Sequence, residues 1–321
     1  MIFRDGAICE RSSIINGMKC LIIGCGYVGL PLGRELVRLG HEVCGLRRHA
    51  SGENELKAAG IQPLTADITR PDTLANLPRG FDWVVNCVAS RGGSAEDYRR
   101  IYLQGTSHLL EWLSAGPPQK LVYTSSTSVY GQTDGSWVNE TSPAEPMAHT
   151  AKVLVETEKL LLEQSGSRVR SPHQMLSAVI LRVAGIYGPD RGHGFKQFLK
   201  NEARVEGDGS RFLNMIHRDD VIGCIIAALQ NGRPGEIYNA VDDEPVSQMD
   251  FFQWLAEELG RELPSPVPEN SRENRKRGVT NKRVANRKLK TELGYQFKYP
   301  NFRIGYTEEI SRLEKTGELQ D

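Results

Sequence analysis

Short runs of apolar residues alternate with longer stretches of helical period along the first two thirds of the chain. The runs are typical of strands buried on both faces; they span 21–23, 41–46, 61–66, 81–88, 120–125 and 178–183. Between them, stretches such as 98–114 and 151–164 carry leucines at helical spacing. Strand and helix repeated in this order predict an α/β fold with a doubly wound parallel sheet.

Beyond Gly188-Pro189 the pattern loosens, with helices expected over 195–200, 221–229 and 249–259 and a strand over 236–239. We expect 18–188 to form the main domain, with 212–240 returning to it. Residues 189–321 are expected to form mainly a smaller lobe over the carboxyl edge of the sheet, where open α/β sheets bind ligands.

Two segments lack a regular apolar pattern. Charged side chains, such as Arg4 and Glu10, interrupt every short apolar run in residues 1–17. This segment is expected to be a disordered tail, or an artefact of a start codon placed before Met18. Residues 165–177, rich in Ser and Arg, are expected to form a solvated loop.

Three glycines, Gly24, Gly26 and Gly29, follow the first strand and precede the first helix with GxGxxG spacing. In a dinucleotide-binding βαβ unit the first allows a tight turn, the second lets the backbone approach the pyrophosphate, and the third lets the helix pack on the strand. The helix N-terminus then attracts phosphate. The alternative is a glycine-rich turn that binds nothing, but the flanking strand and helix favour the dinucleotide site.

Composition excludes several classes. The 321 residues carry 40 basic and 40 acidic side chains, a balance that argues against a nucleic-acid or membrane-surface protein. There is no apolar run of about 18 residues. The six cysteines show no metal-ligand spacing, which favours a reducing, cytoplasmic location and no metal site. A small-molecule substrate and a monomer or homodimer are expected.

Five further segments resemble motifs of one family, the extended short-chain dehydrogenases/reductases of the NAD-dependent epimerase/dehydratase group. They are 124–131 (TSSTSVYG), 181–189 (LRVAGIYGP), 216–221 (IHRDDV), 235–239 (GEIYN) and 293–295 (LGY), similar to SSxxVYG, LRxxxxYGP, IHVDDV, xxxYN and LGW or LGY. GxGxxG in place of GxxGxxG resembles the atypical branch. The resemblance runs from Lys19 almost to the end and implies a Rossmann domain with a C-terminal substrate lobe.

The resemblance also implies a catalytic Ser, Tyr and Lys, with an Asn in the helix after the fourth strand. Ser126 and Lys152 match the serine and the lysine, but Ala148 stands at the tyrosine position and Tyr102 at that of the asparagine. In the family the tyrosine exchanges a proton with the substrate oxygen, which alanine cannot do. The glycine loop, Ser126 and Lys152 support an NADP-dependent reductase or epimerase for a carbonyl or sugar-like substrate, which is the function we expect. Ala148 favours the alternative, a non-catalytic dinucleotide-binding sensor or interaction protein.

Four other side chains and one acidic pair are candidate substitutes for the missing tyrosine. For His149 a surface position is favoured, and for Tyr102, Tyr130 and Tyr187 a packing role. The pair Asp219-Asp220 is expected to cap the helix near Val221 rather than to act as catalytic carboxylates.

The end of the second strand bears on the choice of cofactor. NAD-binding units place a carboxylate there for the ribose 2′-OH, whereas this chain has Arg47 and Arg48. Guanidinium groups pair with a 2′-phosphate, so NADP is expected, with NAD as the alternative. The resemblance implies further cofactor contacts by Gly24, Gly26, Tyr27, Val28, Gly29, Asp67, Ile68, Cys87, Ala89, Lys152 and Ala184.

Substrate contacts are expected from Ser126, Arg191, Asn214 and Arg283. The basic run 272–290, which includes Arg283, has two interpretations: a solvated face, or a cover that holds substrate phosphates. Leu213 stands where many family members place an arginine for the nucleotide diphosphate, which argues against a nucleotide sugar.

Overall fold

The computed structural model describes residues 17–90, 92–166, 176–268 and 280–319. Its centre is a seven-stranded sheet in the order β12-β7-β5-β4-β1-β2-β3, in which every neighbouring pair is parallel. The strands are β1 (Lys19–Ile23), β2 (Glu42–Arg47), β3 (Gln62–Thr65), β4 (Trp83–Asn86), β5 (Lys120–Ser126), β7 (Ala178–Val183) and β12 (Ile237–Ala240). The predicted doubly wound parallel sheet is confirmed.

The first strand shows why continuous apolar runs predicted this sheet. Cys20 and Ile22 belong to the core on one face of the sheet, whereas Leu21 and Ile23 belong to the core on the other. All four are at most 1% exposed. A strand covered on both faces needs apolar side chains at every position, not only at alternate ones.

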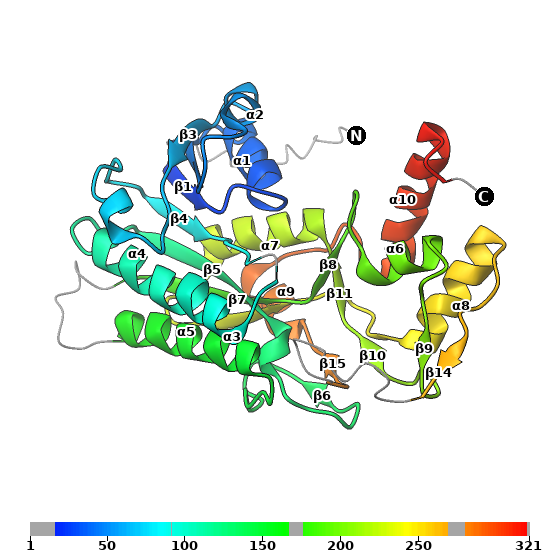
Figure 1. Cartoon of the computed structure of the whole chain (residues 1–321). Coiled ribbons are helices and arrows are strands. Elements are labelled where there is room, and N and C mark those ends of the chain that lie inside the picture. Colours follow the sequence, from blue (N-terminus) through cyan, green and yellow to red (C-terminus); the bar gives the residue numbers. More distant parts are fainter. Residues whose placement is uncertain (1–16, 91, 167–175, 269–279, 320–321) are drawn as a thin grey trace, which may run out of the picture.

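Helices cover both faces (Figure 1). Leu32 and Leu36 of α1 and Val221 and Ile225 of α7 join one core, whereas Leu109 of α4 joins the other. The helices are α1 (Gly29–Arg38), α2 (Glu53–Ala58), α3 (Ala95–Tyr98), α4 (Gly105–Leu113), α5 (His149–Gly166), α6 (His193–Leu199), α7 (Arg218–Asn231), α8 (Gln248–Leu259), α9 (Arg287–Leu293) and α10 (Phe302–Thr316), with short turns η1 (Pro71–Leu74), η2 (Arg99–Gln104) and η3 (Thr127–Val129).

A third, aromatic core lies apart from the sheet, among α6, α8 and α10 (Figure 1). It includes Tyr306, whose ring centroid lies 4.9 Å from that of Phe195 and 5.7 Å from that of Phe251. Small two-stranded sheets accompany this lobe or join it to the main domain: β8 (Gly185–Tyr187) with β11 (Met215–His217), β10 (Phe212–Leu213) with β13 (Val246–Ser247), β9 (Val205–Glu206) with β14 (Pro266–Val267), and β6 (Trp137–Val138) with β15 (Arg283–Val284). The domain boundary at 188/189 stays a prediction.

Element boundaries differ from the predicted ones in informative places. The helix expected over 98–114 is divided into α3, the π-helical η2 and α4. A Cβ on Gly105, the first residue of α4, would lie 2.8 Å from Ile68 Cδ1, so the helix approaches the loop after β3 closely there. Leucine spacing carries no signal for such a local change of helical pitch.

Three other expectations concern segment ends. The helix expected to stop at Gln164 continues to Gly166, so part of the loop predicted over 165–177 is helical. Residues 167–175 of that loop, and 1–16 of the predicted tail, lie outside the described residues. Within the described ranges, every helix is too short or too polar to cross a membrane.

Candidate functional site

The glycine loop between β1 and α1 has the geometry that its spacing predicts. Gly24 has φ +87°, and a Cβ there would lie 2.8 Å from backbone atoms of Val88. A Cβ on Gly29 would lie 2.6 Å from the carbonyl oxygen of Gly24, so the helix packs tightly on the turn. Nothing lies within 4 Å of a Cβ built on Gly26. The middle glycine therefore borders open space, as the approach of a ligand to the backbone requires.

Arg47 connects this loop to α2 through a hydrogen bond and an ion pair. Its Nε donates to the carbonyl of Cys25 at 2.7 Å, and its guanidinium pairs with Glu55 of α2 at 2.8 Å. The side chain is 21% exposed, whereas Arg48 is exposed and its Nε contacts His49 Nε2 at 3.1 Å. Of the two arginines predicted to contact a 2′-phosphate, Arg47 is thus already bonded to other residues of the protein.

Other predicted cofactor residues line the carboxyl ends of the neighbouring strands. The half-buried Cys87 thiol donates to the carbonyl of Gly24 at 3.3 Å, and desolvation raises its pKa to about 12. This cysteine is a packing group of the turn, not a nucleophile. Ala89 is exposed two residues further on.

The remaining members of the predicted set have mainly backbone roles. Asp67 Oδ1 accepts hydrogen bonds from the N–H and hydroxyl of Thr69, which fixes the loop after β3. The side chain of Ile68 is buried. Val28 supplies a carbonyl to the first turn of α1, and the N–H of Ala184 donates to Ala240. Their contacts with a cofactor stay predictions.

The predicted catalytic residues lie on two elements. Ser126 ends β5, where its Oγ accepts a hydrogen bond from the N–H of Ser128 at 3.2 Å. Lys152 lies in the first turn of α5 and is exposed; its side chain has no hydrogen bond or ion pair with any residue that the structure describes. The carbonyl of Ala148 accepts from the N–H groups of Ala151 and Lys152. Ala148 therefore starts the helix but brings no ionisable group.

Tyr102, at the family's asparagine position, is not a pure core residue. It lies in the π-helical η2 and is half-buried, and its hydroxyl accepts a hydrogen bond from the N–H of Ser90 at 3.1 Å. A phenol is thereby placed at the carboxyl end of β4. Tyr130 and Tyr187 are buried and bonded to Asn239 and to the carbonyl of Asn301, which confirms their packing roles.

A buried ion pair beside Ser125 was not predicted from the sequence. Arg182 of β7 pairs with Glu158 of α5 at 2.7 Å, and the side chains are 5% and 4% exposed. Ser125 donates to the same carboxylate, and Arg182 stacks on the ring of Tyr130. The sequence feature that could have predicted this pair is Arg182 itself, a charged residue within the otherwise apolar run of β7.

The predicted substrate residues Asn214 and Arg283 both hold β15. Asn214 donates to the carbonyl of Lys282 and accepts from the N–H of Val284. Arg283 donates to Gly135 and stacks between Trp137 and Phe212. Their substrate contacts stay predictions.

The described part of the basic run is not a uniformly solvated face. Lys282 is 5% exposed, and burial, followed by the charge of Arg211, lowers its pKa to about 8. Lys288 pairs with Glu236. Residues 272–279 of the run lie outside the described residues.

The expectation that Asp219 and Asp220 cap α7 is wrong. His217 is the N-cap, and its Nδ1 accepts from the N–H of Asp219. Asp220 is buried and instead accepts from Tyr295 and from backbone N–H groups further along the chain. Within the described ranges, no group of three or more His, Cys, Asp or Glu side chains is arranged to hold a metal ion.

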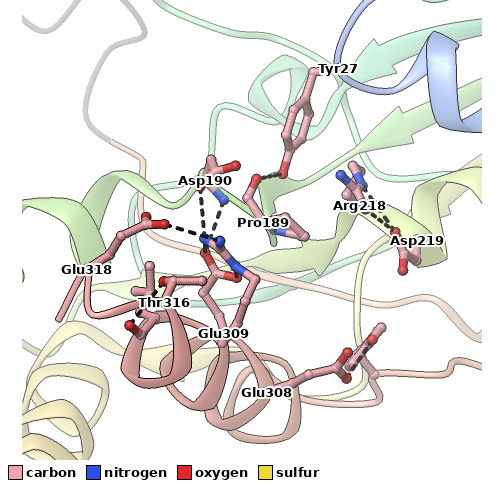
Figure 2. Close-up of polar contacts among 12 residues, drawn as sticks. Tyr27, Pro189, Asp190, Arg218, Asp219, Glu308, Glu309, Thr316 and Glu318 are labelled. Carbon is pink, nitrogen blue, oxygen red and sulfur yellow. Dashed lines mark hydrogen bonds and ion pairs between the residues drawn. The ribbon is translucent and has the colours of Figure 1, made fainter.

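Tyr27 connects the glycine loop to the C-terminal lobe. Its hydroxyl donates to the carbonyl of Pro189 at 3.0 Å (Figure 2). The guanidinium carbons of Arg191 and Arg218 lie 4.9 and 5.4 Å from its ring centroid. Burial raises the pKa of the phenol to about 12, so it remains a hydrogen-bond donor at neutral pH.

Comparison with known proteins agrees with this geometry. Protein YeeZ of Escherichia coli K12 is 30% identical over 289 residues, which cover 88% of this chain and 97% of YeeZ. The 4-hydroxy-2-methyl-3-oxo-4-farnesyl-3,4-dihydroquinoline-1-oxide ketoreductase of Stigmatella aurantiaca is 27% identical, over 74% of this chain and 72% of that protein. The dTDP-glucose 4,6-dehydratase DesIV of Streptomyces venezuelae shares the fold, with a TM-score of 0.78 at 23% identity over 93% of this chain and 97% of DesIV.

The same comparison assigns the family. The sequence model of the NAD dependent epimerase/dehydratase family matches residues 20–240, from β1 to the end of β12. These residues include the glycine loop, Ser126 and Lys152, which are the parts of the site that the structure places along the carboxyl edge of the sheet. The chain belongs to the NAD dependent epimerase/dehydratase family, among the short-chain dehydrogenases/reductases.

Proposed function

We propose that this protein is an NADP-dependent reductase or epimerase for a small carbonyl or sugar-like substrate bound under the C-terminal lobe. The observation that carries the proposal is the glycine loop, where Gly26 borders open space at the start of α1 while Gly24 and Gly29 are tightly packed. This combination is the one that a dinucleotide-binding βαβ turn requires. The name of the Stigmatella aurantiaca relative, a ketoreductase, favours reduction over epimerisation.

The preference for NADP rests on the end of β2. The strand itself ends with Leu46 and Arg47 and carries no carboxylate at the position that holds the ribose 2′-OH in NAD-binding units, and the Glu55 carboxylate of α2 is already paired with Arg47. The guanidinium of Arg47 is already bonded to Glu55 and to the carbonyl of Cys25. The exposed Arg48 is therefore the arginine that we expect to bind the 2′-phosphate. Arg47 then acts indirectly, by fixing the glycine loop.

The protein's contribution to chemistry is limited by Ala148. When bound, the nicotinamide ring of the cofactor supplies or accepts a hydride. Ser126 can donate a hydrogen bond to a substrate oxygen, and Lys152 can hold the nicotinamide ribose. A proton must come from Ser126, Tyr102, water or the substrate itself, and a positioned acid contributes about 10²- to 10⁴-fold to a rate. We therefore expect slow turnover on generic carbonyl compounds.

A second function remains supported by one observation. The position of the family's proton donor is an alanine whose carbonyl caps α5, and the hydroxyl of Tyr102 is bonded to the backbone of Ser90. A protein that binds the dinucleotide without turning it over, as a sensor or interaction partner, would need neither group for catalysis.

Steady-state oxidation of NADPH over a panel of aldehydes and ketones separates the reductase from the non-catalytic protein, since only reduction consumes NADPH. For the unmutated reductase we expect slow but saturable oxidation, which rises by about ten-fold or more in Ala148→Tyr because Ser126 and Lys152 already stand in the family's positions. His149→Tyr, one residue along the same helix, is the matched control and should not gain activity. Tight NADPH binding without turnover in either the unmutated protein or Ala148→Tyr would favour the non-catalytic function.

A further inference from the structure

Two arginines from different elements of the chain meet at one residue of the glycine loop. Arg191 follows β8, and Arg218 is the first residue of α7. Both guanidinium groups lie within about 5.5 Å of the ring centroid of Tyr27, which precedes α1 by two residues. The electron-rich face of an aromatic ring attracts such cations.

The charges at this place are only partly balanced. Arg218 is 22% exposed and pairs with Asp219 at 3.0 Å, whereas Arg191 is exposed and forms no ion pair with the described residues. The other carboxylates near Tyr27 are Asp190 and Glu309, and both are already bonded to Arg312. Because two cations beside one ring repel each other, an anion placed between them and the glycine loop would be stabilised.

The segment that carries Arg191 is held rigidly. Asp190 has φ +58°, a strained conformation for a residue with a side chain. Its N–H donates to the carboxylate of Glu309 at 3.0 Å, and Arg312 donates to Asp190 Oδ1 at 2.8 Å, which secures the segment on α10 (Figure 2). The neighbouring carbonyl of Pro189 accepts the Tyr27 hydroxyl. The lobe thus fixes the position of Arg191 relative to the glycine loop.

We propose that Arg191, from the C-terminal lobe, and Arg218, from the start of α7, bind the pyrophosphate of the dinucleotide, with the ring of Tyr27 positioning both guanidinium groups. The open space at Gly26, next to Tyr27, is where the pyrophosphate comes close to the backbone. Helix α1 then contributes the partial charge of its N-terminus, and Arg191 and Arg218 contribute one full charge each. This inference rests on dinucleotide binding in the proposed function, but not on turnover.

The test is the affinity of Arg191→Ala, Arg218→Ala and the double variant for NADPH and ADP-ribose, measured by calorimetry. Each single variant should bind both ligands about ten-fold or more weakly, since a charge-assisted hydrogen bond is lost. Affinity for adenosine 2′-monophosphate, which lacks the pyrophosphate, should stay unchanged. Arg233→Ala, just beyond the other end of α7, is the matched control and should bind like the unmutated protein. Thermal melting confirms that each variant is folded.

The outcomes distinguish the inference from the function on which it rests. If the unmutated protein binds NADPH and the folded double variant binds it within about two-fold of the same affinity, the assignment of the two arginines to the pyrophosphate is refuted and the cofactor site stands. An equal loss for adenosine 2′-monophosphate would also refute it, because the arginines would then act on the adenosine end or on the fold. If the unmutated protein binds neither NADPH, NADH nor ADP-ribose, both proposals fail.

Discussion

Lys282 is predicted to destabilise the folded protein at neutral pH. Its side chain is 5% exposed, and its Nζ donates to the hydroxyl of Thr280 at 2.8 Å. Burial, followed by the charge of Arg211, lowers its pKa from 10.5 to about 8. A lower pKa in the folded state means that the protonated, charged form is less stable there than in the unfolded chain.

The size and sign of the effect follow from this difference in pKa. One pKa unit corresponds to about 1.36 kcal/mol, so the charged ammonium costs about 3 kcal/mol at pH 7. The unfolded chain binds more protons than the folded protein between pH 8 and 10.5, and the contribution of Lys282 to stability therefore rises with pH in that window. At pH 9.5 the cost has fallen to about 1.4 kcal/mol.

Urea unfolding of Lys282→Met tests this reasoning, because methionine keeps much of the apolar stem and removes the charge. We expect the variant to be more stable than the unmutated protein by about 2–3 kcal/mol at pH 7 and by less than half of that at pH 9.5. Lys159→Met, at an exposed position of α5, should change stability by less than about 0.5 kcal/mol at either pH. A variant that is less stable at pH 7, or whose difference does not depend on pH, would refute the account of Lys282.

Two other changes have defined outcomes. Glu158→Gln should lower the free energy of unfolding by about 3–5 kcal/mol, because it leaves the buried Arg182 without its carboxylate. The control Glu156→Gln breaks an exposed pair on the same helix and should cost less than about 1 kcal/mol. Equal losses for the two variants in chemical denaturation would contradict this. In fluorescence titrations, Arg48→Ala should reduce the preference for NADPH over NADH. Arg47→Ala should instead weaken the binding of both cofactors by comparable factors, because it loosens the glycine loop. The reverse pattern would assign the 2′-phosphate to Arg47.

The sheet could be predicted from the sequence because its physical cause is local. Strands buried on both faces are continuous apolar runs, and 178–183 coincides with β7 at both ends. The glycine spacing likewise predicted which positions are packed and which one is open, since Gly24 and Gly29 meet residues close in sequence or just after the adjacent strand β4.

The parts that could not be predicted depend on contacts between distant residues. The carbonyl of Lys282 meets Asn214, 68 residues away, and the Tyr27 hydroxyl meets Pro189, 162 residues away. Neither partner is marked by composition or period. The engagement of Arg47 depends on where α2 places Glu55, so two adjacent arginines that look equivalent in sequence have different surroundings.

Calorimetric titration of the unmutated protein with NADPH and with NADH at the same ionic strength tests directly whether the glycine loop is a cofactor site that prefers NADP. We expect one dinucleotide bound per chain, with NADPH bound more tightly because Arg48 can pair with its 2′-phosphate. Equal affinities would contradict the assignment to NADP and leave the dinucleotide site standing. No binding of either ligand would contradict the claim that the open glycine loop is a cofactor site.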